Sequence, residues 1–183
     1  MIKYQQAEGT DMLRQIVGID QLDGRKLMAL YAEGNCENAE EFYPDEDISV
    51  GIQRVETEFL SFLNDTFLPK PENTYWVLEE NGEYISALRL TELPERRFYL
   101  EALETHPNYR RKGFATKLLT EVTETLKAGG PFCICDCVSK RNSASIRTHK
   151  RAGFLIASDV GYDYLQKEAD ERDYGFEYVY TGE

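Results

Sequence analysis

The 183-residue sequence has no long apolar run, and this shortage limits the classes of protein to which it can belong. No stretch approaches the roughly 18 consecutive apolar residues that a membrane-spanning helix requires. The first residues also lack the cationic start and apolar run of a secretory signal peptide. We therefore expect a cytoplasmic protein with no membrane partner.

Histidine and cysteine are scarce, with two and four residues respectively. Three of the cysteines, Cys133, Cys135 and Cys137, alternate along the segment PFCICDCV, so on a strand they would share one face. Neighbouring same-face residues of one strand lie too far apart for a relaxed disulfide, and zinc does not usually take this spacing without nearby histidines. We expect buried, reduced cysteines on a central strand and no metal site.

Cationic residues are fewer than acidic ones. The chain has 21 Lys and Arg and 33 Asp and Glu, which gives a formal net charge of -12. Phosphate contacts depend on Lys and Arg, so the deficit argues against a nucleic-acid partner. A cationic substrate is compatible with it. Acidic side chains gather in residues 37–47, where we expect a solvated face that could steer an amine if it borders a substrate cleft.

Hydrophobic periodicity indicates that the first third of the chain is mostly helical. A strand is expected at Ile2–Gln6, followed by helical segments near Leu13–Val17, at Asp23–Glu33 and at Ile48–Phe67. A chain of this length suits one domain that buries a core, and no Pro-, Gly- or Ser-rich linker divides it. We therefore expect a single domain over residues 1–183.

The remainder of the chain predicts a β-hairpin, a third antiparallel strand and then alternating helices and strands. The pair Asn81-Gly82 tolerates the positive φ values of a type I′ turn, and it separates the predicted strands Tyr75–Glu79 and Tyr84–Leu90. The later predicted elements are a strand at Phe98–Thr105, the cysteine strand, a helix at Asn142–Arg151, a strand at Leu155–Tyr162, a charged connector at Gln166–Asp173 and a strand at Tyr174–Tyr180. This order predicts a mixed α/β fold.

The segment Arg110–Ala115 joins a predicted strand to an amphipathic helix and is the first candidate site. Gly113, with alanine two positions later, lets successive backbone N–H groups close around an anion at the positive end of the helix. The three cations at positions 110–112 would otherwise oppose the helix macrodipole, which favours carboxylates in the first turn. An anionic ligand removes that conflict, so the segment predicts a cofactor that carries phosphate.

Two motifs in this part of the chain resemble those of the GNAT superfamily of N-acetyltransferases. The pattern R-x-x-G-x-A at Arg110–Ala115 is similar to the family's acyl-CoA pyrophosphate loop, [QR]-x-x-G-x-[GA]. The tract NSASIRTHKRAGF is similar to the later family pattern N-x-x-[AS]-x-x-x-[YH]-x-x-x-G-F, and it follows at the right distance. The resemblance covers roughly Tyr75–Phe154.

The resemblance implies a GNAT-like fold, with a central, mostly antiparallel mixed sheet of about six to seven strands flanked by helices. An acyl-CoA-binding core would occupy about residues 75–154, and a helical segment on the acceptor side about residues 10–70. It further implies acetyl-CoA as cosubstrate. The implied contacts are Leu103, Glu104, Thr105, Arg110, Arg111, Lys112, Gly113, Phe114, Ala115, Thr116, Asn142 and Ser145.

The resemblance also implies direct attack of an amine on the acetyl thioester within a ternary complex. Glu101 and Glu104 are candidates to accept the amine proton. Alternation puts residues three apart on opposite faces of a strand unless a bulge intervenes, so we expect only one of the two to face the cleft. Of the two, we favour Glu104. The family often has a tyrosine where His149 stands, near the CoA sulfur, and histidine could serve there as the general acid although imidazole is shorter than phenol.

The acceptor stays open at this point. A primary amine of a small molecule or peptide is the first hypothesis. The alternatives are a protein N-terminal or lysine acetyltransferase and a non-catalytic acyl-CoA-binding sensor module. The acyl chain preference and the oligomeric state, for which a homodimer is one option, are not determined by these motifs.

Overall fold

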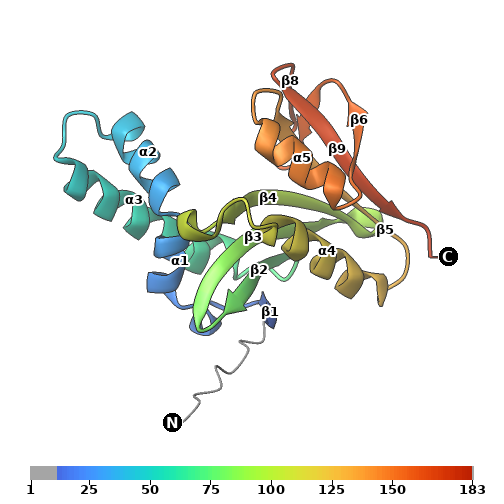
Figure 1. The fold of residues 1–183 in the computed structure, drawn as a ribbon, viewed down its shortest axis with the longest axis horizontal. Helices are drawn as coiled ribbons and strands as arrows, with labels where there is room; N and C mark the ends of the chain where they lie inside the picture. Colours follow the sequence, from blue (N-terminus) through green and yellow to red (C-terminus); the bar gives the residue numbers. More distant parts are fainter. Residues whose placement is uncertain (1–11, 183) are drawn as a thin grey trace, which may run out of the picture.

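The computed structural model describes residues 12–182 and contains one seven-stranded mixed sheet beside a small two-stranded one (Figure 1). The large sheet has the order β1-β2-β3-β4-β5-β9-β6, and β7 pairs with β8 in the small one. The strands are β1 (Met12–Ile16), β2 (Asn73–Glu80), β3 (Glu83–Leu93), β4 (Arg97–Thr105), β5 (Phe132–Ser139), β6 (Leu155–Ser158), β7 (Gly161–Asp163), β8 (Glu168–Asp170) and β9 (Asp173–Tyr180). The expected mixed α/β fold is confirmed.

All neighbouring strands of the large sheet run antiparallel except β4 and β5, which are parallel. This parallel pairing is short, because it joins only Arg97–Tyr99 to Cys133–Cys135. Beyond these residues β4 continues to Thr105 and β5 to Ser139 without pairing to one another. The sheet therefore opens into a wedge between the two strands.

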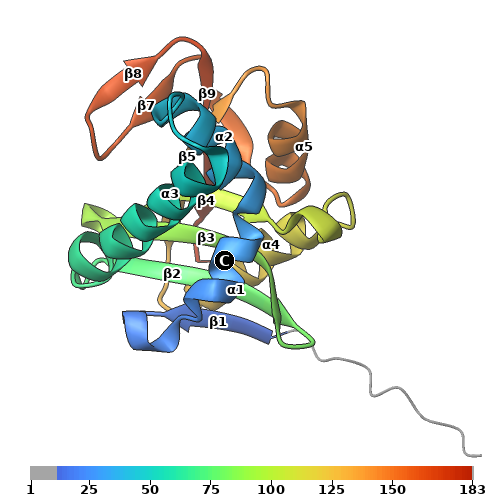
Figure 2. The same ribbon diagram turned by 90° about the vertical axis from the view of Figure 1, so that its left-hand side faces the viewer.

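In the described part of the chain, five α-helices cover the two faces of the large sheet. In Figure 2, α4 and α5 lie together on the right, and the β7–β8 hairpin lies at the upper left. The helices are α1 (Gly24–Leu30), α2 (Ala32–Phe42), α3 (Ile48–Phe62), α4 (Phe114–Lys127) and α5 (Ser143–Arg151), with short 3₁₀ turns at Ile19–Gln21, Pro94–Arg96 and Pro107–Tyr109.

Strand alternation divides the buried side chains between two cores. On β2, Trp76 and Leu78 belong to the core that contains Leu118 of α4, whereas Tyr75 and Val77 belong to the core that α1 and the end of α3 close. Because consecutive residues of a strand point to opposite faces, an almost continuous apolar strand serves both cores. The face toward α1–α3 and the face toward α4 and α5 are thus structurally distinct.

Several sequence predictions for the first third need correction. The segment predicted to be helical near Leu13–Val17 is strand β1, which pairs with β2; five residues cannot sustain an isolated helix, and the edge of β2 supplies their hydrogen bonds. The helix predicted at Asp23–Glu33 is divided at Tyr31 into α1 and α2. The strand predicted at Ile2–Gln6 lies outside the described residues.

The remaining predicted elements lie closer to the helices and strands of the structure. The predicted helix Ile48–Phe67 is α3 followed by a π-helical turn at Leu63–Phe67. The hairpin is confirmed, with positive φ at both Asn81 and Gly82. The strand predicted at Leu155–Tyr162 is split between β6 and β7, and the charged connector contains β8. Within residues 12–182, no helix has both the length and the hydrophobicity needed to cross a membrane.

Candidate active site

A pocket of about 410 Å³ lies where the end of β4 meets the start of α4 and one side of α5. These three elements come together because the β4–β5 wedge separates the strands that precede α4 and α5. The lining residues are Leu103, Glu104, Thr105, Tyr109, Arg110, Arg111, Gly113, Phe114, Ala115, Thr116, Asn142, Ala144, Ser145, Thr148 and Arg151. Of the residues expected to contact acyl-CoA, Lys112 is the one outside this set.

The loop before α4 has an unusual backbone. Gly113 has φ +88° and Arg111 has φ +62°, so two left-handed residues alternate within it. A Cβ at Gly113 would meet no atom within 4 Å, so the glycine serves the backbone conformation rather than a close approach. Among residues 12–182, no side chain caps the first amides of α4. Such a loop at a helix N-terminus offers N–H groups to an anion.

Two of the three loop cations have partners within the protein. Arg110 donates from Nε to the Thr105 carbonyl oxygen at 3.3 Å and pairs through Nη2 with Glu104 Oε1 at 3.2 Å; its Nη1 pairs with Glu33 of α2. Lys112 Nζ donates to the Asn108 carbonyl oxygen at 3.1 Å. The protein itself therefore relieves part of the charge conflict at the start of α4.

Helix α5 supplies the opposite wall of the pocket. Asn142 caps this helix, because its Oδ1 accepts from the backbone N–H of Ser145 at 2.9 Å, and both residues line the pocket. Ala144, Thr148 and Arg151 line it as well, and sequence analysis missed them. Their spacing with Ser145 is that of one helical face, which is the signal that could have identified them.

His149 does not lie where the sequence placed it. Its ring is fully buried behind the α5 wall and does not line the pocket. Nε2 lies 2.6 Å from Asp136 Oδ2 of β5, a short contact that is not aligned as a hydrogen bond, and Nδ1 lies 2.9 Å from the Ser145 carbonyl oxygen. An imidazole held by β5 in this way is not positioned as an acid at the pocket.

The environment of this buried pair shifts both groups. Burial lowers the pKa of His149, but the Asp136 carboxylate and the Ser145 carbonyl oxygen together raise it by more, so the net pKa is raised. Burial raises the pKa of Asp136 against the opposing effect of the imidazole. The pair joins α5 to β5 and is a structural contact.

A bulge in β4 determines where Glu101 and Glu104 point. Glu104 stands opposite Ala87 and Glu101 opposite Arg89, so two β4 residues face the single β3 residue between them. Because Ala87 and Arg89 share a face of β3, both carboxylates point to the face covered by α1–α3. Because β4 contains a bulge, Glu101 and Glu104 share a face. Strand alternation therefore does not show which of the two carboxylates faces the cleft.

The two carboxylates differ in their partners. Glu104 Oε1 accepts from the Thr105 backbone N–H at 2.8 Å and also pairs with Arg110. Glu101 Oε1 lies 3.6 Å from Arg89 Nη2. Burial raises the pKa of Glu101; Arg89 opposes this rise. A carboxylate with a raised pKa is better matched to accept a proton near neutral pH.

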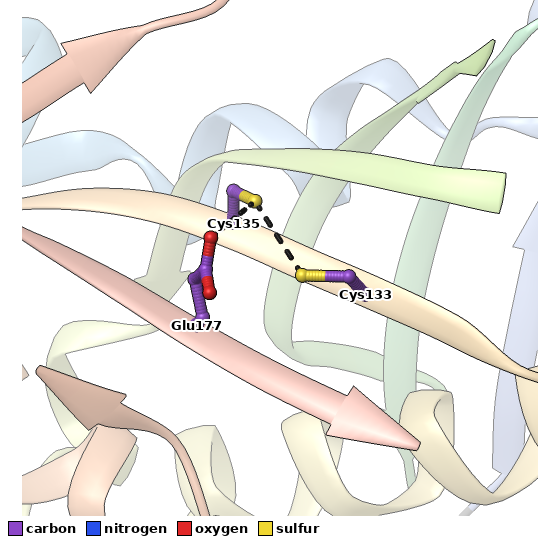
Figure 3. Close-up of side chains that lie close together, drawn as sticks. All are labelled: Cys133, Cys135 and Glu177. Atoms are coloured by element: carbon purple, nitrogen blue, oxygen red, sulfur yellow. Dashed lines mark hydrogen bonds between the residues drawn. The ribbon is translucent and has the colours of Figure 1, made fainter. Parts of the chain in front are cut away.

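The cysteine strand has the expected faces, and its thiols contact β9. Cys133 and Cys135 lie with their Sγ atoms 3.7 Å apart, and Glu177 approaches Cys135 (Figure 3). Arg97 Nη1 lies 2.9 Å from Cys135 Sγ and 3.2 Å from Glu177 Oε1, so a cation already occupies this position. Burial raises the pKa of Cys133 to about 12. Protonated thiols beside a guanidinium make a poor metal site.

Comparison with protein families gives one decisive match. The model of the acetyltransferase (GNAT) family matches residues 35–154, which is more than half of the chain. The chain belongs to the GNAT family. It is therefore an acyl-CoA-dependent acetyltransferase with acetyl-CoA as its cosubstrate. A search of curated protein sequences gives no significant match.

Solved structures share this GNAT fold at low sequence identity. The PaiA N-acetyltransferase from Thermoplasma acidophilum in complex with coenzyme A is 17% identical, with a TM-score of 0.63 over 93% of this chain and 99% of that one. The ribosomal-protein-S18-alanine N-acetyltransferase from Escherichia coli is 17% identical, with a TM-score of 0.58 over 94% and 95%. An N-acetyltransferase from Staphylococcus aureus Mu50 is 20% identical, with a TM-score of 0.54 over 95% and 99%.

Proposed function

We propose that this GNAT protein transfers the acetyl group of acetyl-CoA to a primary amine of a small molecule or peptide by direct attack in a ternary complex. The observation that carries the proposal is the β4–β5 wedge: a pocket with an anion-binding loop lies on one side, and Glu101 lies on the opposite face of the same strand. Cosubstrate and amine can therefore approach one point from two sides.

The positive charges and the free backbone amides of the pocket suit an anionic cosubstrate. The loop around Gly113 supplies amides at a helix N-terminus for the pyrophosphate, and Arg111 and Arg151 add cations to the lining. Leu103 borders the pocket where β4 has no β5 partner, so its backbone can face the pantetheine arm, whereas the Thr105 carbonyl and amide are already engaged by Arg110 and Glu104. The thioester would then reach the wedge.

Glu101 is the residue that we propose as general base, in preference to Glu104. Glu104 holds Arg110 and the Thr105 amide, so it supports the loop. In the transfer step the amine nitrogen bonds to the acyl carbon, the carbon–sulfur bond breaks, and Glu101 accepts the amine proton. The CoA thiolate takes its proton from solvent, and holding both reactants in line supplies much of the acceleration.

Calorimetric titration with acetyl-CoA and with free CoA tests the pocket first, and an amine panel then tests turnover. The panel compares small free amines with peptide N-terminal and lysine amines while release of the CoA thiol is measured. Transfer to small or peptide amines supports the proposal. Transfer only to an intact protein would favour a protein acetyltransferase, and tight binding without transfer to any amine would favour a sensor.

A further inference from the structure

The bulge in β4 holds a residue other than glycine in a left-handed backbone conformation. Ala102 has φ +52°. A residue with a Cβ adopts that region at an energetic cost, and such conformations persist where surrounding contacts enforce them. Here the strained residue is one of the two that separate the candidate carboxylates of Glu101 and Glu104. A contact that holds Ala102 would therefore also hold their directions.

That contact comes from the junction of α1 and α2. Tyr31 donates from its hydroxyl to the Ala102 carbonyl oxygen at 2.7 Å, and Tyr75 donates from its hydroxyl to that of Tyr31 at 2.8 Å. The Tyr31 ring packs edge-on against Phe59 of α3 with 5.3 Å between ring centroids. Burial raises the pKa of Tyr31, so the hydroxyl remains a donor at neutral pH.

We propose that Tyr31 is a positioning residue whose hydroxyl maintains the β4 bulge and so keeps Glu101 and Glu104 on the same face of the sheet. Loss of the bulge would shift the pairing with β3 by one residue, and a shift of one residue turns a strand side chain to the other face. Tyr31 does not line the pocket. Its effect on turnover rests on the proposed function, whereas its effect on the strand does not.

The same junction has a second link to the cosubstrate side. Glu33, two residues after Tyr31, pairs with Arg110 of the loop before α4. The start of α2 thus contacts both the bulge and the loop. Through these two contacts, the helices on the acceptor side touch both strand β4, which carries Glu101, and the loop before α4.

The test compares Tyr31→Phe, which removes one hydroxyl and keeps the ring, with the wild type. We expect kcat to fall about tenfold while the KM for acetyl-CoA changes less than about twofold, because the base is misplaced but the pocket is intact. Amide hydrogen exchange in residues 101–105 should become faster. Tyr84→Phe is the matched control, since it removes a buried hydroxyl that accepts from the Asp23 N–H on the same side of the sheet.

Ala102→Gly provides the second arm. Glycine tolerates positive φ, so in the Tyr31→Phe background it should restore most of kcat and the slow exchange. Unchanged exchange and kcat in Tyr31→Phe, or changes equal to those of Tyr84→Phe, would overturn the proposal. The proposal would also be overturned if Ala102→Gly restored neither the kcat nor the slow exchange that Tyr31→Phe loses. If Tyr31→Phe does not fold, Tyr75→Phe weakens the same hydroxyl chain and should give a smaller change in the same direction.

The exchange measurement separates this inference from the proposed function. If the wild type binds acetyl-CoA but acetylates no amine, faster exchange at residues 101–105 in Tyr31→Phe alone still supports the role of Tyr31 in the bulge. If the wild type is active but exchange does not respond, the transfer reaction stands and the role of Tyr31 is wrong.

Discussion

The two faces of the sheet beside the β4–β5 wedge are built by different means. The pocket side depends largely on backbone, with left-handed residues at Arg111 and Gly113 and an uncapped α4 N-terminus. The opposite side depends on side chains, because Glu101, Arg89 and Tyr31 come from three different elements. A backbone site can be encoded in a few consecutive residues, whereas a side-chain site requires distant segments to meet. Mutations on the pocket side should therefore mainly weaken acetyl-CoA binding, whereas mutations on the opposite side should mainly lower turnover.

The largest effect should come from breaking the pocket side at Gly113. Gly113→Glu forces a residue with a Cβ to φ +88° and places a carboxylate where we expect the pyrophosphate, so binding of acetyl-CoA should fall by at least about a hundredfold in calorimetry. Gly82→Glu is the matched control, since Gly82 also has positive φ and open space but lies in the β2–β3 turn. Wild-type affinity in a folded Gly113→Glu protein would show that the loop does not hold the anion.

The next effect concerns the contact behind the pocket wall. His149→Phe keeps an aromatic ring but leaves the buried Asp136 carboxylate without its partner, so the free energy of unfolding in urea should fall by about 3 kcal/mol at neutral pH. Replacing Asp136 by leucine in the same protein should recover most of this loss. A large fall in turnover with unchanged stability would instead restore the general-acid role.

The stability that His149→Phe loses should depend on pH. The pKa of His149 is raised in the folded protein, so its stabilisation is fully present below the unfolded-state pKa of about 6.5. It is lost as pH rises through the folded-state pKa. The stability difference between wild type and His149→Phe should therefore narrow in alkaline buffer, and a difference that widens would contradict the pairing.

A slightly smaller effect is expected from breaking the acceptor side at Glu101. Glu101→Gln should lower kcat about a hundredfold and leave the affinity for acetyl-CoA unchanged. Wild-type activity should decline as pH falls through the raised pKa of Glu101, and the variant should lose that limb of the profile. Glu104→Gln is the comparison: because it releases Arg110, it should raise the KM for acetyl-CoA more than it lowers kcat. The reverse pattern would make Glu104 the base.

A weaker effect on cosubstrate binding is expected from Arg151 on the α5 wall of the pocket. Arg151→Ala removes an exposed cation of the pocket lining and should weaken acetyl-CoA binding about fivefold, with a shallower dependence on salt. Arg147→Ala removes a cation of the same helix that does not line the pocket, and it should leave the affinity unchanged. Equal losses in both variants would indicate a general charge effect.

The difference between the two sides also explains which predictions succeeded. The β2–β3 hairpin and α4 were predicted from local signals, namely the pair Asn81-Gly82 and the amphipathic helical pattern that follows the Gly113 loop. The β1 strand was missed because its five residues gain their hydrogen bonds only from β2. The position of His149 was missed because Asp136, its partner, lies on another element.

Patterns among residues close together in the chain were enough to predict the mixed α/β fold, the loop around Gly113 and the GNAT family. Contacts between distant segments put Glu101 and Glu104 on one face, bury His149 against Asp136 and bring the Tyr31 hydroxyl to the Ala102 carbonyl. The physical reason is that a bulge and a buried pair arise from contacts between strands and helices far apart in the sequence, which local patterns do not specify.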